Sequence, residues 1–505
     1  MMPGMQTSPT APASRPRFLS ESDCQTIAHR LARAVRGGGE SIVTIISKWA
    51  GNVRWARNRV TTTGEDRDNK IVVTRSLRGA KGSVAINTVT DEALVAATRQ
   101  AERLMQRDSE KPEYDLAIQP QSPFQYWAEP AAAPQLFIEA TYQQDAGQRA
   151  EAARRLMQSA KATGMLSAGY IQVSATSLAY ITSWGYADYE QYTWAQYSVT
   201  VREPHGTGSG WAGVDWLDWT KIDGDRISAI ALEKCLTSRN PVAVEPGRYT
   251  TILESQAVCD FVGPFMFHDW LDRGANERSL LMPFHKSGEN EPDVLGGVPL
   301  ARSRLGERVM DERISISTDP LDPELGFPLL TKMDLLNLSG GEYPRIFHPT
   351  TWIDHGVLRT ASYEREYAIR YLGRDLGMPN SGAFRMSGGA TAVEEMIATT
   401  ERGLLVTRFD QVDGPDGVAL VCRGYTRDGL WLIENGKISK PVKNMLFVES
   451  VLFALNNVDQ LGPPQRVFHP VMSGKFGDWW FDPQPVIVPP LKIRDFSFTA
   501  LSEAI

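Results

Sequence analysis

Four residues whose side chains can bind a metal ion lie close together near the middle of the chain: Cys259, Asp260, His268 and Asp269. A thiolate, a carboxylate and an imidazole can each coordinate zinc, and bound zinc activates water for hydrolysis. Their spacing matches no established pattern of zinc ligands. We therefore treat Cys259, Asp260 and His268 as minor candidates for a rebuilt metal or catalytic site.

A second candidate site combines three tryptophans, Trp211, Trp216 and Trp219, with two aspartates, Asp215 and Asp218. Aromatic rings beside carboxylates could hold a carbohydrate. Packing at a domain interface is the interpretation we favour, because aromatic side chains contribute much of the area that interfaces bury.

The histidines of the C-terminal half are dispersed, and loop-forming residues adjoin several of them. His285, His348, His355 and His469 are all of this kind. We expect surface or packing roles for them. His355 precedes a glycine within a pattern typical of a hairpin, which favours a turn over a metal ligand.

The elements that position these residues follow from the spacing of apolar residues and from turn signals. We expect an α+β protein in which N-terminal α/β units, mixed sheets with packed helices, precede a large, mainly β C-terminal domain. The expected division is a disordered tail at 1–17, an α/β domain at 18–110, a linker at 111–134, a second α/β domain at 135–240 and a β-rich domain at 241–500.

Apolar periodicity also predicts individual elements. Helices are expected at 22–36, 91–107, 254–271 and 392–402. Early strands are expected at 41–47, 52–61, 70–77 and 82–87. The helix at 254–271 would carry most of the metal-binding candidates.

Composition limits the class of function. The net charge is −7 and the isoelectric point is near 5.7, so a broad basic surface for nucleic acid is not expected. No uncharged apolar run is long enough to cross a membrane. The four cysteines are widely separated and form no Cys-x-x-Cys pair, which fits a reducing cytoplasm.

Five short segments, in order along the chain, carry a resemblance to a known family. They are Asn52–Thr61, Gly306–Val309, Glu401–Val406, Leu432–Ile438 and Pro441–Lys443. In this order the chain resembles the TldD/PmbA family, zinc metallopeptidases once described as modulators of DNA gyrase. The resemblance extends roughly from Ser41 to Phe498.

The resemblance implies a change at the metal site. Catalytic members carry His-Glu-x-x-x-His on a helix at this point, and aligning Ala257–Val258 with the family pattern puts Ser255, Gln256 and Asp260 at its three functional positions. A Ser hydroxyl is a poor zinc ligand, and Gln cannot take a proton from metal-bound water. The chain therefore looks like the PmbA (TldE) branch, inactive alone, with no catalytic residue, metal or cofactor of its own.

The family also implies partners. We expect a TldD-like subunit that supplies the zinc, or a homodimer, and an unfolded peptide as substrate, without membrane or nucleic acid. Two other functions stay open. One is a self-sufficient hydrolase that uses Cys259 or Asp260 with His268, and the other is a non-enzymatic scaffold that binds extended peptides at a strand edge of the β-rich domain.

Overall fold

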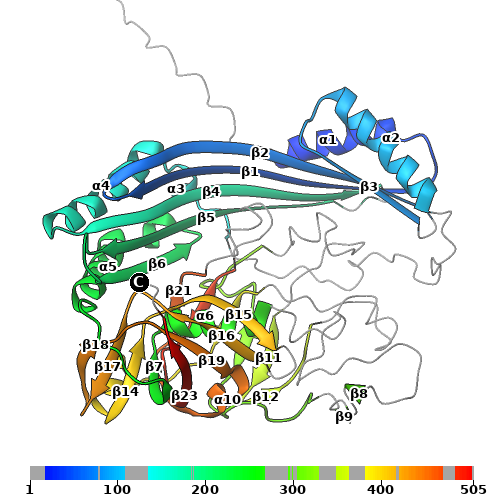
Figure 1. Cartoon of the computed structure of the whole chain (residues 1–505). Helices are drawn as coiled ribbons and strands as arrows, with labels where there is room; N and C mark the ends of the chain where they lie inside the picture. The colour runs from blue at the N-terminus through cyan, green and yellow to red at the C-terminus, as the bar shows by residue number, and fades with distance from the viewer. Residues whose placement is uncertain are drawn as a thin grey trace, which may run out of the picture.

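The computed structural model describes residues 18–77, 80–108, 135–183, 185, 187–267, 294–295, 298–299, 304–328, 349–362, 382–416, 420–469 and 484–502. Helices and extensive sheets combine in an α+β fold, with the α/β part at the N-terminus and the β-rich part at the C-terminus, as the sequence predicts. Figure 1 shows a long curved sheet over a more compact β-rich body.

The N-terminal sheet has six strands in the order β3-β2-β1-β4-β5-β6, and each neighbouring pair is antiparallel. The strands are β1 (Glu40–Ala56), β2 (Arg59–Leu77), β3 (Ala80–Ile86), β4 (Leu166–Thr182), β5 (Ala187–Arg202) and β6 (Ser209–Trp216). Since β1 pairs with β4, the segments before and after residues 109–134 share one sheet.

The strand expected at 52–61 is wrong as a single element. β1 continues to Ala56, and Arg57 and Asn58 both have positive φ (52° and 58°), which turns the chain into β2. A two-residue turn with both central residues left-handed matches the twist of an antiparallel hairpin. The apolar alternation continues across the turn, so it did not reveal the reversal.

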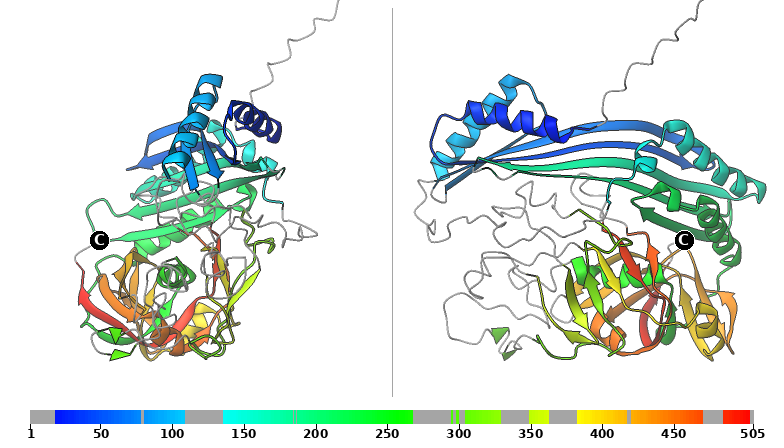
Figure 2. Two further views of the ribbon diagram at one scale, coloured as in Figure 1. Left: turned by 90° about the vertical axis from the view of Figure 1, so that its right-hand side faces the viewer. Right: turned by 180° about the vertical axis from the view of Figure 1, so that it is seen from behind.

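Helices cover the sheet at both of its ends. They are α1 (Glu21–Ala34), α2 (Asp91–Asp108), α3 (Glu139–Tyr142), α4 (Ala146–Ala162) and α5 (Gly224–Thr237), with a short 3-10 helix at Trp219–Lys221. At one end, α1 and α2 bury Leu31 and Ala101 against Ile45 and Val73. At the other, α4 and α5 share a core with Trp55 and Tyr197. Figure 2 shows these two helical groups at opposite ends of the arch.

The C-terminal body contains a nine-stranded and a six-stranded sheet. The nine-stranded sheet consists of β15 (Phe409–Asp416), β16 (Val421–Thr426), β19 (Met445–Ser450), β23 (Leu491–Leu501), β7 (Gly247–Leu253), β14 (Arg402–Val406), β17 (Leu430–Glu434), β18 (Lys437–Pro441) and β20 (Val458–Leu461). The six-stranded sheet consists of β12 (Val357–Leu358), β11 (Thr350–Asp354), β10 (Ile316–Thr318), β13 (Phe384–Met386), β22 (Val486–Val488) and β21 (Gln465–Val467). The pair β8 (Val294–Leu295) and β9 (Val298–Pro299) stands apart.

Among the described residues, the helices that accompany these sheets are α6 (Ser255–Phe267), α9 (Val393–Ala398) and α10 (Val451–Asn456). The described part of α6 is apolar on most sides, and Ala257, Val258 and Phe261 are fully buried in a core shared with both sheets. A helix with this pattern belongs inside a protein. The C-terminal core therefore fixes the position and rotation of α6.

Candidate functional site

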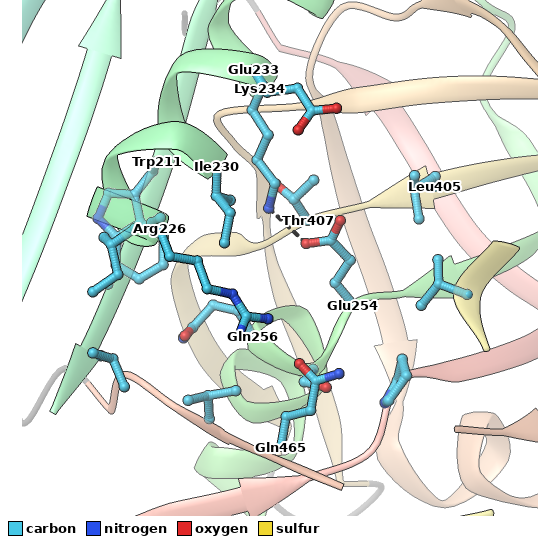
Figure 3. Close-up of a pocket in the computed structure, with 18 of the residues that line it drawn as sticks. Trp211, Arg226, Ile230, Glu233, Lys234, Glu254, Gln256, Leu405, Thr407 and Gln465 are labelled. Carbon is cyan, nitrogen blue, oxygen red and sulfur yellow. Dashed lines mark hydrogen bonds and ion pairs between the residues drawn. The ribbon is translucent and has the colours of Figure 1, made fainter. Parts of the chain in front are cut away.

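A cleft of about 1220 Å³ lies where the N-terminal sheet meets the C-terminal body. One wall comes from β6 and α5, and the other from the start of α6, from β14 and β17, and from β21. Figure 3 shows residues of both walls facing this space. The cleft contains two of the three motif-equivalent positions, Ser255 and Gln256.

Gln256 is held by backbone bonds on both sides of its amide. Its Nε2 donates to the carbonyl oxygen of Phe468 at 2.8 Å, and its Oε1 accepts from the Phe468 N–H at 3.1 Å. The same Nε2 donates to Oδ1 of Asp260 at 3.0 Å. Both polar ends of this side chain thus join α6 to the segment after β21, which is a structural use of the amide.

Asp260 is half-buried and lies one turn after Gln256 on α6. Its Oδ2 accepts from the N–H of Phe409 at 2.9 Å. Burial raises the pKa of this carboxyl to about 6, while the positive charge of Arg408 and the bonds from Gln256 and Phe409 oppose the rise. Asp260 therefore anchors α6 to β15 and changes its charge near neutral pH.

Ser255 differs from both. It is 6% exposed, and its Oγ has no hydrogen-bond partner within the described residues. The backbone N–H of Val258 bonds to Glu254, so Ser255, Gln256 and Ala257 form the open first turn of α6, and no bond from their N–H groups is found in the described part of the chain. An unfilled hydrogen-bonding capacity thus remains at the wall of the cleft.

The replacement zinc ligands are not brought together. Cys259 is buried in the apolar core, where burial raises its pKa well above the usual value and keeps the thiol protonated. His268 lies outside the described residues, as do Asp269, His285 and His348. Within the ranges that the structure describes, no three His, Cys, Asp or Glu side chains form a group that could hold a metal ion. The donor set at the start of α6 does not fit zinc.

The packing interpretation of the tryptophan and aspartate cluster is confirmed in part. Trp211, Asp215 and Trp216 lie at the junction of the two halves, whereas Trp219 packs on the N-terminal core and Asp218 caps the short 3-10 helix. Asp215 Oδ1 lies 3.3 Å from Arg466, and the two side chains are 2% and 6% exposed. The guanidinium of Arg466 also stacks over Trp216 at 4.3 Å. Trp211 contacts the ring of Phe468 and the guanidinium of Arg408. No carbohydrate site is needed to explain these residues.

His355 lies in a turn, as predicted, and His469 lies at the junction of the two halves. His355 has a positive φ of 48° and forms the turn between β11 and β12 with Gly356. His469 is half-buried at the junction, where its backbone N–H donates to Oδ2 of Asp215 at 3.1 Å. Burial lowers the pKa of its imidazole to about 4.

The free edge of β6 opens into the cleft. Ser209 and Asp215, at its two ends, use their outward backbone groups: Ser209 exchanges bonds with Ser238, and the Asp215 carbonyl accepts from Arg466 at 2.7 Å. In an edge strand, the backbone N–H and C=O groups of every second residue point away from the neighbouring strand. Like those of Ser209 and Asp215, the backbone groups of Trp211 and Gly213 therefore point outward. Both line the cleft, and neither has a partner on that side within the described residues.

Charged residues of α5 complete the wall. Lys234 Nζ pairs with Oε2 of Glu254 at 2.6 Å. Arg226 has no ion pair among the described residues, and it extends from α5 toward Gln256 in Figure 3. Neither basic residue was predicted as part of a site, because their helical spacing indicates only an exposed face.

Fold and cleft together define a two-part α+β protein with its candidate site at the junction. The family model of the PmbA/TldA metallopeptidase C-terminal domain matches residues 246–500, just over half of the chain. The chain belongs to the TldD/PmbA family.

Solved structures share the fold across almost the whole chain. A candidate modulator of DNA gyrase from Bacteroides thetaiotaomicron is 16% identical with a TM-score of 0.74, covering 95% of this chain and 100% of that one. TldE from Thermococcus kodakarensis is 14% identical with a TM-score of 0.70, covering 94% and 99%. A candidate gyrase modulator from Thermotoga maritima is 14% identical with a TM-score of 0.70, covering 94% and 100%. No curated protein matches by sequence.

Among the described residues, no helix is both long and apolar enough to cross a membrane.

Proposed function

We propose that this chain is the non-catalytic, TldE-like subunit of a metallopeptidase assembly that acts on unfolded peptides. A TldD-like subunit would supply the zinc, and a second copy of this chain is the alternative partner. The observation that carries the proposal is the state of α6: Gln256 and Asp260 are used in structural bonds, and Ser255 offers only a neutral hydroxyl. A zinc site needs three or four donors that are free to coordinate.

The cleft supports the peptide part of the proposal. An extended chain can add to a free strand edge through backbone hydrogen bonds, which depend little on sequence. The outward groups of Trp211 and Gly213 offer such an edge. This edge belongs to the N-terminal sheet, whereas the scaffold hypothesis placed it in the β-rich domain.

The first experiment measures zinc per chain in protein purified without chelator. We expect a value near zero, and a value near one would contradict the proposal. The chain is then mixed with a subunit that carries an intact His-Glu-x-x-x-His, and cleavage of a denatured protein is followed. Cleavage should need both subunits and should disappear when the partner's motif Glu is changed to Gln.

The two other hypotheses predict different results. A self-sufficient hydrolase would cleave without a partner and lose activity in Asp260→Ala. Burial and protonation of Cys259 argue against its use as a nucleophile or ligand. A pure peptide-binding scaffold would bind peptide saturably but release no fragments even when the partner is present.

A further inference from the structure

The start of α6 combines features of an anion site. The N–H groups of its first turn are unbonded in the described part of the chain, and the dipole of this 13-residue helix places partial positive charge there. Such a terminus is a general property of helices and indicates no ligand by itself. Two further observations distinguish this one.

The first is the hydroxyl of Ser255. This side chain is more than nine-tenths buried, lines the cleft, and its Oγ has no hydrogen-bond partner among the described residues. A buried hydroxyl without a partner is costly, and a ligand that accepts its hydrogen bond would remove that cost. An acceptor placed here would also face the first-turn N–H groups.

The second observation is an unpaired cation, Arg226, on the opposite wall of the cleft. Arg226 projects from the first turn of α5 toward Gln256, the residue that follows Ser255, and lines the same cleft (Figure 3). Its guanidinium has no carboxylate partner in the described residues, unlike Lys234, which pairs with Glu254. A guanidinium binds carboxylates in a bidentate manner and can contribute to an oriented site.

The lining also carries carboxylates, and none of those that the structure describes forms an ion pair with the guanidinium of Arg226. Glu254 is neutralised by Lys234, and Asp215 by Arg466. Glu233 also lines the cleft, but it lies seven residues beyond Arg226 on α5, about 10 Å along the helix axis. Glu394, on α9, and Asp223, the N-cap residue of α5, are further exposed carboxylates of the lining. Asp223 uses its Oδ1 to accept the backbone N–H of Arg226 at 2.9 Å, which caps the helix. The cleft thus has both acidic and basic groups, with Arg226 at the end near α6.

We propose that Arg226, Ser255 and the N-terminus of α6 bind a carboxylate of the peptide that occupies the cleft. The inference rests on the proposed function and deepens it, because it names the chemical group that the subunit recognises. The carboxylate comes from the C-terminus of the peptide or from an acidic side chain. In either case the site orients a chain whose backbone adds to β6.

The test measures binding of fluorescently labelled unfolded peptides to the full chain by anisotropy. One peptide is made with a free C-terminal carboxylate and with a C-terminal amide, and a second pair carries an internal Glu or Gln. Wild type should bind a carboxylate form about tenfold more tightly than its neutral counterpart. The pair of peptides that shows this preference tells whether the carboxylate comes from the C-terminus or from an acidic side chain.

Arg226→Gln should weaken binding of the preferred acid form about tenfold and bring the acid-to-neutral ratio close to one. Ser255→Ala should reduce the same ratio by a smaller factor. Glu233→Gln is the matched control on the same face of α5, and it should keep the ratio or increase it. Circular dichroism and thermal melting show whether each variant is folded.

The outcomes separate the two proposals. Equal binding of acid and neutral peptides, or an unchanged ratio in Arg226→Gln, overturns the carboxylate site and leaves the peptide-binding subunit standing. The carboxylate site is also overturned if acid and neutral peptides bind equally and inorganic phosphate competes equally with both. Failure to bind any peptide contradicts both this site and the peptide part of the proposed function, whereas the zinc measurement tests the loss of the metal independently.

Discussion

The two walls of the cleft use polar side chains in opposite ways. On the C-terminal side, Gln256 in the wall and Asp260, one turn further along α6, are bonded to the backbone of Phe468 and Phe409, so their polarity stabilises the fold. On the N-terminal wall, Arg226 and Glu233 stand on an exposed helical face, and their charges are available to a ligand. Substitutions of Gln256 and Asp260 should therefore change stability, whereas substitutions of Arg226 should change binding.

The largest effect is expected where the walls join. Arg466→Ala would leave the buried carboxylate of Asp215 without its cation and remove the stacking on Trp216. Breaking a buried pair in this way costs about 3 to 5 kcal/mol. Urea unfolding should show that loss. Arg423→Ala is the matched control, because its pair with Asp413 is exposed and should contribute less than about 1 kcal/mol.

Gln256→Ala tests whether this residue is structural. The change removes the bonds to both backbone groups of Phe468 and to Asp260, and we expect a loss of about 1 to 3 kcal/mol in the free energy of unfolding. Gln256→Glu should also destabilise the protein at neutral pH, because a carboxylate cannot donate to the Phe468 carbonyl. A stable variant with altered catalysis would instead support the rebuilt hydrolase.

Asp260 should make stability depend on pH. Its folded pKa is raised to about 6 from 3.8, mainly by burial, so the folded state binds more protons than the unfolded state between these values. The contribution of Asp260 to stability is therefore fully present below about pH 4 and declines as pH rises through 6.

His469 contributes to the pH dependence with the opposite sign: because burial lowers its pKa, the folded state loses stability as pH falls. Comparing wild type with Asp260→Asn separates the contribution of Asp260, since His469 is present in both proteins. Between pH 5 and 7.5, wild type should lose about 1 kcal/mol relative to the variant. Parallel pH profiles for the two proteins would contradict the burial of a titrating carboxyl at this position.

Ser255→Ala should have the smallest effect on stability and the opposite sign. Removing a buried hydroxyl that has no partner should stabilise the free protein by about 0.5 to 1 kcal/mol. Thermal melting of the variant without peptide would show it. A clear destabilisation would mean that the hydroxyl is bonded in solution and is not free for a ligand.

Several features of the site could be predicted from the sequence. The helix around Ser255 and its apolar face at Ala257 and Val258 follow from residue spacing, and the structure confirms a helix at Ser255–Phe267. The turn at His355 was also predicted correctly. The cleft was not predictable, because α5 and α6 come from separate parts of the chain and meet only through tertiary packing.

The sequence by itself determined the chemical identity of the three positions on α6 and the α+β class, because side-chain chemistry and apolar periodicity are local properties. The tertiary structure alone decided which polar atoms are already used. Whether Gln256 is bonded and Ser255 is unbonded depends on Phe468, more than two hundred residues away, and on the packing around the first turn of α6. Hydrogen bonding in a folded protein is set by which groups come into contact, and burial decides what an unbonded group costs.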